Sequence, residues 1–463
     1  MTPRGAFRTL SAVLNVALRT LSNGLRIVAL ELPHVHSMSA ALMVRTGPRF
    51  ERPEENGIAH LVEHLLFRGT ESHPTSVDFH AAVERVGGEV NGLTQRDATT
   101  VHITVPPRAG EVGLRLLGEL CTQPTLSGLD VERDVVLEEI LDAVDAEGNE
   151  LDLDSLSRRV FWRGHPMSLP VAGEAELVES FTERECRAFF ERSFVAENAV
   201  LAVAGPIDPE QCFAWAQAAF SHMPRGRPLD AGAPPLPLAH PRIHVQATDD
   251  AQVSALLTFA APHENDPAFS QLLLLKRILE DGFASRLRQS VCERRGLAYS
   301  VSASIDAYQD VGAFDIEVTC SPKKLYAAVE QIWTTLDEMR ATPVGEDELD
   351  RAKARHRADL DFALDDPNEI CSWYGASVLV GAPVGYEAWS SGVLASTAEA
   401  VRDLAHRLFR SEDALLSLLG PVDERTVRRL ERLMGRPEGT TVWLGEESDD
   451  EPDESSGPRL VVG

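Results

Sequence analysis

The order of apolar and polar residues predicts two strands followed by a helix in the first half of the chain. The glycine-rich segment Gly87–Asn91 leads into Thr99–Val105, where apolar and polar side chains alternate as in a half-buried strand. Apolar residues then recur with helical spacing over Gly113–Leu120. Strands beside amphipathic helices are typical of an α+β domain, in which helices back one sheet.

The second half of the chain repeats this order. Gly296–Val301 leads into the alternating run Gly312–Val318, and a helical pattern follows over Lys324–Met339. The recurrence of strand, turn, strand and helix indicates duplication. We therefore predict an α+β protein with two similar halves, each a mostly antiparallel sheet packed against helices.

A proline-rich segment, Pro224–Pro237, separates the two halves. Proline at this density prevents helix formation and sheet pairing, so we expect an extended surface connector. A chain of 463 residues also exceeds what one hydrophobic core usually supports. We predict a first domain over residues 1–225, a linker over 226–241, a homologous second domain over 242–425 and a C-terminal extension over 426–463.

The charge of the chain limits its partners. The formal net charge is -28, which argues against nucleic acid and anionic membrane surfaces. Part of this charge lies in the acidic run Glu446–Glu454, which we predict to be a solvated, disordered tail. The remaining acidic surface either favours basic peptides or selects nothing, and the second case is the more common one.

Cysteine usage and hydropathy indicate a cytoplasmic protein. The six cysteines form no CxxC pair, which indicates reduced thiols, and they are Cys121, Cys186, Cys212, Cys292, Cys320 and Cys371. No stretch approaches the roughly 18 apolar residues of a membrane span. The N-terminal apolar run Leu10–Leu18 is a poor signal peptide, because Asn15 interrupts it and no clear cleavage site follows.

The segment His60-Leu61-Val62-Glu63-His64 is the candidate chemical centre. On a helix, His60, Glu63 and His64 share one face, and apolar residues fill most of the remaining circumference. Ionisable groups on a buried helix need a compensating partner, and a zinc ion bound by both imidazoles provides one. Glu63 would then face the water that the metal activates. The alternative is an exposed helix on which these residues coincide by accident.

A catalytic zinc usually takes three protein ligands, so a third must come from elsewhere. The run Val131–Ile140 has helical periodicity, and within it Glu132 and Glu139 share a face while Glu138 points elsewhere. Glu139 is a candidate ligand, with Glu132 as a hydrogen-bond acceptor for a histidine N–H or the water. Spacing alone leaves open that this is an ordinary solvated acidic face.

These motifs together resemble those of the pitrilysin-like (M16) zinc metallopeptidases, which carry HxxEH. The similarity in length is closest to the subgroup of the mitochondrial processing peptidase β subunit and its bacterial relatives. The resemblance extends from about Leu18 to Asp423. The segments that carry it are Gly47–Gly57, His60–Thr70, Gly87–Asn91, Glu132–Ile140 and Arg295–Val301.

The resemblance implies a role for each matched residue. It places His60, His64 and Glu139 on the family's zinc ligands, Glu63 on its general base and Glu132 on its supporting glutamate. It also implies that two chains, or one long fused chain, close into a chamber around an unfolded peptide. For this chain the expected assembly is a homodimer or a heterodimer with a related M16-like chain. The peptide would add as a strand to a sheet edge near the zinc, where the family pattern places Asn91 and Gly92.

The sequence departs from the family pattern at Cys292. Active relatives carry an arginine seven residues before the tyrosine that matches Tyr299, and a thiol cannot replace the hydrogen bonds of a guanidinium. The nearby arginines, which a helix would point elsewhere, are Arg288, Arg294 and Arg295. Smaller departures are Gly92, where alanine is frequent, and Asp97, where glutamate is frequent.

Three hypotheses follow. The chain is an active homodimeric zinc endopeptidase, the zinc-bearing subunit of a heterodimer whose partner supplies an intact Arg…Tyr pair, or a non-catalytic peptide-binding scaffold. Tyr299 would hold the substrate, or it is a half-buried strand tyrosine with a structural hydrogen bond. For Cys292 we expect a packing role rather than a redox role.

Overall fold

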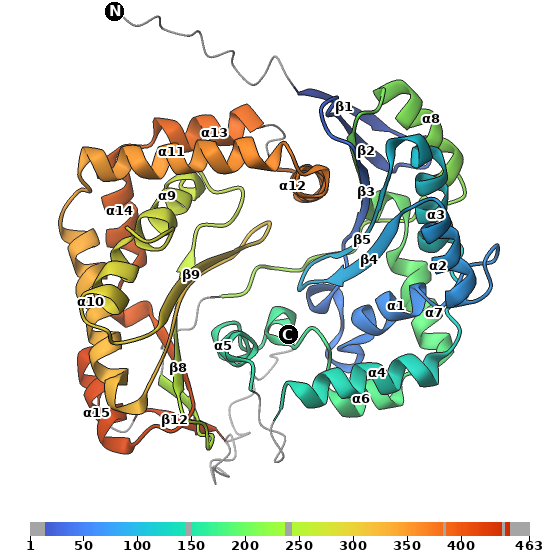
Figure 1. Ribbon diagram of the computed structural model, residues 1–463. Helices are drawn as coiled ribbons and strands as arrows, with labels where there is room; N and C mark the ends of the chain where they lie inside the picture. The colour runs from blue at the N-terminus through green and yellow to red at the C-terminus, as the bar shows by residue number, and fades with distance from the viewer. Residues whose placement is uncertain (1–13, 145–150, 237–242, 383–385, 438–439, 445–463) are drawn as a thin grey trace, which may run out of the picture.

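Two six-stranded mixed sheets with surrounding helices make up the protein (Figure 1). This computed structural model describes residues 14–144, 151–236, 243–382, 386–437 and 440–444. The acidic run Glu446–Glu454 lies outside these ranges. The segment from Pro224 to Leu236 contains neither helix nor strand, as its prolines require.

The first sheet has the strand order β1-β2-β6-β3-β5-β4, and all neighbouring strands are antiparallel except β2 and β6. The second sheet has the order β12-β7-β11-β8-β10-β9, in which β7 runs parallel to both β11 and β12. The strands are β1 Asn15–Thr20, β2 Arg26–Glu31, β3 Met38–Val44, β4 Glu89–Thr94, β5 Thr99–Val105, β6 Ala199–Gly205, β7 Ile243–Gln246, β8 Val253–Ala261, β9 Ser300–Ala307, β10 Gly312–Cys320, β11 Leu415–Leu419 and β12 Val442–Leu444.

The two sheets share one plan over five strands. In both, the second strand in the order runs parallel to the third, and three antiparallel pairs follow to the edge. Only the outermost strand differs, because β1 is antiparallel to β2 whereas β12 is parallel to β7. The predicted α+β fold with two similar halves is therefore confirmed.

Helices surround both sheets (Figure 1). The predicted helices over Gly113–Leu120 and Lys324–Met339 are confirmed as α3 and α10. The helices are α1 Ile58–Leu66, α2 Ser76–Arg85, α3 Gly110–Thr122, α4 Leu129–Asp142, α5 Leu153–Phe161, α6 Ala175–Ser180, α7 Glu183–Ser193, α8 Pro209–Phe220, α9 Phe269–Leu279, α10 Leu325–Ala341, α11 Glu346–Ala363, α12 Pro367–Val380, α13 Tyr386–Ala395, α14 Ala398–Leu408 and α15 Glu424–Leu433. None of the helices in the described ranges is long and apolar enough to cross a membrane.

Each half contributes one helix to the sheet of the other half. Helix α12 packs across β3 and β6 of the first sheet, and Gly375 allows a close approach because a Cβ there would meet Met43 and Ala202. Strands β3 and β6 are therefore covered on both faces and contain only buried residues. In return, α5 packs against β8 and β11 of the second sheet.

Strands β4 and β9 each form one edge of their sheet, and β1 and β12 form the opposite edges. Strand β4 lies beside helix α1, which carries the HxxEH segment. Strand β9 belongs to the other half of the molecule (Figure 1). All six cysteines are buried and free, as predicted for reduced thiols.

Candidate metal centre

A buried carboxylate anchors the start of helix α1. Glu51 accepts hydrogen bonds from the backbone N–H of Gly57 at 3.1 Å and of Ala59 at 2.9 Å, which are otherwise unpaired groups at a helix N-terminus. Gly57 has φ 93° and lies so close to Gly173 that a Cβ would meet its Cα at 2.6 Å. Burial raises the pKa of Glu51 to about 7 despite these hydrogen bonds. The metal-site helix is thus held at its first turn.

Helices α1 and α4 bring two imidazoles and one carboxylate together. His60 Nε2 lies 3.6 Å from Glu139 Oε2, and His64 Nε2 lies 3.7 Å from Glu139 Oε1. The two imidazole rings are 4.7 Å apart between centroids. Helix α1, which carries both histidines, packs directly against α4. The i, i+4 spacing of the histidines therefore aims both rings at α4.

This donor set fits a zinc ion. Tetrahedral zinc with bonds of about 2.0–2.2 Å separates its ligand atoms by about 3.4 Å, close to the distances between Glu139 and the two imidazoles. The ligand atoms of all three residues lie within 4.8 Å of one another. Burial and the neighbouring His64 lower the pKa of His60 to about 4, which keeps the imidazole in the neutral form that binds metals.

Glu132 supports the cluster from two turns before Glu139 on α4. Its Oε2 lies 3.2 Å from Nδ1 of His64, and its Oε1 accepts a hydrogen bond of 3.2 Å from Arg68. An acceptor at Nδ1 places the proton there and leaves Nε2 free as a metal ligand. Glu138, between the two site glutamates in sequence, is exposed, as is Glu139.

Glu63 lies beside the cluster and against the edge strand. The Thr94 hydroxyl donates a hydrogen bond of 2.9 Å to its Oε2, while a Cβ at Gly92 would meet its Oε1 at 2.3 Å. Burial raises the pKa of Glu63, and the hydrogen bonds from Thr94 oppose this rise. A carboxylate with a raised pKa is suited to accept and return a proton.

A cavity of about 430 Å³ opens over these residues. Both residues predicted to line a substrate edge, Asn91 and Gly92, lie on β4 and border this cavity. The cavity is lined by His60, Glu63, His64, Phe67, Arg68, Ser76, His80, Val90, Asn91, Gly92, Leu93, Thr94 and Glu132. Two of the three candidate metal ligands, His60 and His64, therefore border the same space as the edge strand β4.

Tyr299 lies apart from this cavity. It directly precedes β9, is 89% exposed and does not line the space over the metal cluster. The alternative of a half-buried strand tyrosine is therefore wrong, because the side chain projects into solvent. Cys292 is buried in the core of the second half, within the short π-helical turn Arg288–Glu293, as expected for a packing residue.

Three residues of the site were missed as functional residues from sequence. Arg68 and Glu51 lie inside segments that carry the family resemblance. Only the structure shows that Arg68 pairs with Glu132 and that Glu51 binds the first turn of α1. Thr94 follows Gly92 by two positions, and strand periodicity places both on one face of β4. That periodicity could have placed Thr94 on the same face as Gly92, but not in contact with Glu63.

Comparison with known proteins covers both halves. Residues 26–175 match the family described as Insulinase (Peptidase family M16), and residues 180–355 match the family described as Peptidase M16 inactive domain. An uncharacterized zinc protease of Mycobacterium leprae is 32% identical over 425 residues, which cover 90% of this chain and 94% of that protein. An uncharacterized zinc protease of Bacillus subtilis, YmxG, is 28% identical over 411 residues, which cover 87% of this chain and 97% of that protein.

Solved structures share the fold. A protease from Helicobacter pylori has a TM-score of 0.80 at 21% identity, and the alignment covers 88% of this chain and 100% of that protease. A peptidase M16 inactive domain from Pseudomonas fluorescens has the same TM-score and identity and covers 88% of this chain and 98% of its own. These matches agree on one peptidase family and do not single out the mitochondrial β-subunit group.

Proposed function

Because this chain belongs to the M16 family of peptidases, we propose that it is a zinc-dependent endopeptidase that cleaves short or unfolded peptides inside a closed chamber. The observation that carries this proposal is the convergence of His60, His64 and Glu139, with Glu63 beside them. The second half carries no equivalent of this cluster among its described residues, in keeping with the inactive-domain family that it matches.

The residues of the site divide the work of peptide hydrolysis. His60, His64 and Glu139 would hold a zinc ion, which would supply Lewis acidity to the scissile carbonyl and to the attacking water. Glu63 takes a proton from the attacking water and delivers it to the leaving amine. The open edge of β4 pairs with the peptide backbone, so binding depends little on the substrate side chains.

A second chain completes the chamber in this proposal. The tyrosine at position 299 is 89% exposed and lies outside the cavity of its own chain, so it is available to a neighbouring chain. In a homodimer, each chain would offer Tyr299 to the peptide bound by the other. Cys292 favours the alternative, a heterodimer with a related M16-like chain whose intact Arg…Tyr pair supplies the guanidinium.

The proposal is tested with the purified chain alone, using a mixture of quenched-fluorescence peptides and elemental analysis of zinc. We expect about one zinc per chain and cleavage that is lost in Glu63→Gln, because the amide cannot accept a proton. Glu138→Gln, an exposed carboxylate next to the ligand Glu139, is the matched control and should retain activity.

The alternatives separate in the same experiment. Zinc without cleavage would favour the heterodimer, and cleavage should then return when a related chain with the Arg…Tyr pair is added. Absence of zinc from the protein would contradict the whole proposal.

A further inference from the structure

Strand β4 presents different residues to its two sides. Thr94 is 7% exposed and Gly92 is half-buried, and both face helix α1 and the carboxylate of Glu63. Asn91 and Leu93 alternate with them and are exposed. The strand whose edge faces the cavity therefore also contacts the general base of the proposed reaction.

A chain of three buried hydroxyl groups ends on that base. Thr46 Oγ1 lies 2.5 Å from Thr99 Oγ1, Thr99 Oγ1 lies 3.0 Å from Thr94 Oγ1, and Thr94 donates to Glu63 Oε2 at 2.9 Å. Each hydroxyl has one proton to donate, and a carboxylate only accepts. Because Thr94 donates to Glu63, Thr99 must donate to Thr94 and Thr46 must donate to Thr99. All three donors therefore point toward the carboxylate.

The sheet holds this series of three threonine hydroxyls in place. Thr94 and Thr99 are register partners on β4 and β5, and Thr99 is also the register partner of Val44, two residues before Thr46. Thr46 and Thr99 are each 1% exposed, so water does not compete for their hydrogen bonds. Hydrogen bonds in a buried series polarise one another, which strengthens the last donor.

The two oxygens of Glu63 have different surroundings. Oε2 is held by the Thr94 hydroxyl. Oε1 points toward Gly92, where an added Cβ would stand 2.3 Å away in the present position of the carboxylate. Oε2 is therefore held by the protein, and Oε1 is left to accept a proton from the attacking water.

We propose that Thr94 is a positioning residue for peptide hydrolysis, and that the Thr46–Thr99–Thr94 hydroxyl chain holds Glu63 by Oε2 so that Oε1 receives the proton of the water. This inference rests on the proposed function. It makes β4 a single element that aligns both the substrate backbone and the general base, so that the two keep a fixed relation to each other.

The test compares Thr94→Val, which removes the hydroxyl at nearly constant shape, with Thr94→Ser, which retains it. We expect kcat of Thr94→Val to fall about 10- to 100-fold, as for the loss of a hydrogen bond to a charged group, with KM within about twofold. Thr94→Ser should retain most of kcat. Zinc content should be unchanged in both variants, because neither change touches a ligand.

The matched control is Thr104→Val. It breaks another cross-strand hydroxyl pair of the same sheet, with Ser39 at 2.9 Å, and leaves Glu63 untouched. It should lower the unfolding midpoint about as much as Thr94→Val while kcat stays within about twofold. Equal losses of kcat in Thr94→Val and Thr104→Val, or in Thr94→Val and Thr94→Ser, would overturn the proposal.

A crystallographic readout separates this inference from the proposed function. In zinc-loaded crystals, the Glu63 carboxylate should leave its position in Thr94→Val and keep it in Thr94→Ser. This comparison does not depend on turnover. An unmoved carboxylate in Thr94→Val would contradict the positioning role even if the wild-type chain cleaves peptides. If the carboxylate moves in Thr94→Val but the wild-type chain cleaves no peptide, the contact of Thr94 with Glu63 is supported and the peptidase function is rejected.

Discussion

Glu132 joins the metal cluster to its surroundings at the scale of single residues. One of its oxygens faces Nδ1 of His64, and the other accepts from Arg68. Partners of this kind typically change metal affinity about 10- to 100-fold when they are removed. We predict this loss of zinc affinity for Glu132→Ala, measured by competition with a chromophoric chelator.

Glu138→Ala serves as the control for this measurement. It removes an exposed carboxylate from the same helix that is not part of the candidate metal group His60, His64 and Glu139. Its zinc affinity should stay within about twofold of wild type. If both variants lost affinity equally, the effect would come from the acidic charge of α4 and not from the contact with His64.

Sequence spacing predicts the places of the candidate site residues to different degrees. The i, i+3, i+4 spacing of His60, Glu63 and His64 is local, so helix geometry alone predicted their shared face. Glu139 lies far along the chain, and spacing left its role open until the packing of α4 against α1 was seen. The contact of Thr94 with Glu63 depends on the register of an edge strand against a helix, which periodicity does not specify.

At the scale of elements, an ion pair joins α7 to the turn that precedes α1. Arg192 donates to both oxygens of Glu55, which also pairs with Arg52. Burial alone would raise the pKa of Glu55, but the hydrogen bonds from Arg192 and Arg52 outweigh it and lower the pKa to about 2. The ionised form therefore stabilises the fold.

The sign of the pH dependence follows from this lowered pKa. The stabilisation is fully present above the ordinary glutamate value near 4.5 and is lost as the pH falls toward 2. We predict that Glu55→Gln lowers the free energy of unfolding by about 1–2 kcal/mol at pH 7, a range that allows for solvent screening. The difference from wild type should shrink in urea titrations below about pH 4.5.

Glu54→Gln is the matched control, one residue away in the same turn and 67% exposed at its side chain. It should change the free energy of unfolding by less than about 0.5 kcal/mol at each pH. A Glu55→Gln deficit that stayed constant from pH 7 to pH 3 would show that the ionised carboxylate is not its cause.

Apolar periodicity predicts which helices and strands form, but it does not predict well which elements they pack against. The strand over Thr99–Val105 and the helices α3 and α10 were predicted from spacing alone. The domain over residues 242–425 was predicted from the proline-rich linker, and within that range α12 covers β3 and β6 of the first sheet. An apolar helix face does not encode which of two similar sheets will cover it.

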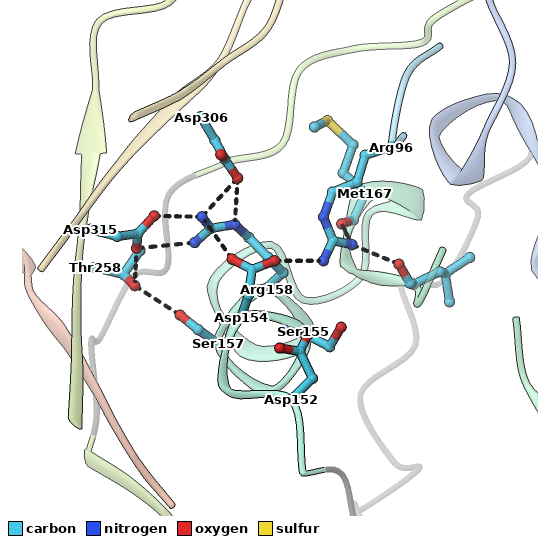
Figure 2. Close-up of polar contacts among 11 residues, drawn as sticks. Arg96, Asp152, Asp154, Ser155, Ser157, Arg158, Met167, Thr258, Asp306 and Asp315 are labelled. Atoms are coloured by element: carbon cyan, nitrogen blue, oxygen red, sulfur yellow. Dashed lines mark hydrogen bonds and ion pairs between the residues drawn. The ribbon is translucent and has the colours of Figure 1, made fainter. Parts of the chain in front are cut away.

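At the scale of the whole molecule, a buried arginine joins the two halves (Figure 2). Arg158 on α5 is 1% exposed and pairs with Asp306 on β9 at 2.8 Å and with Asp315 on β10 at 2.5 Å. Asp154 lies 3.1 Å away and also pairs with Arg96, at the end of the β4–β5 hairpin. The three aspartates are close enough to hold a metal ion, but the guanidinium lies among them.

The Arg158 cluster predicts a large and specific loss of stability. Removing one partner of a buried ion pair leaves uncompensated charge, which costs about 3–5 kcal/mol, so Arg158→Met should lower the free energy of urea unfolding by that amount. Arg428→Met, which breaks an exposed pair with Glu424, should cost less than about 0.5 kcal/mol.

A double variant identifies the cause of this loss. Asp315 is 2% exposed, so its carboxylate carries most of the uncompensated charge once Arg158 is gone. Asp315→Asn should therefore restore part of the stability lost in Arg158→Met, although it destabilises the wild-type chain. Additive losses in the double variant would mean that Arg158 acts through packing against Trp162, 5.1 Å from its ring, and not through charge. A positive coupling would instead show that the two halves are held together by an ion pair between residues 157 positions apart.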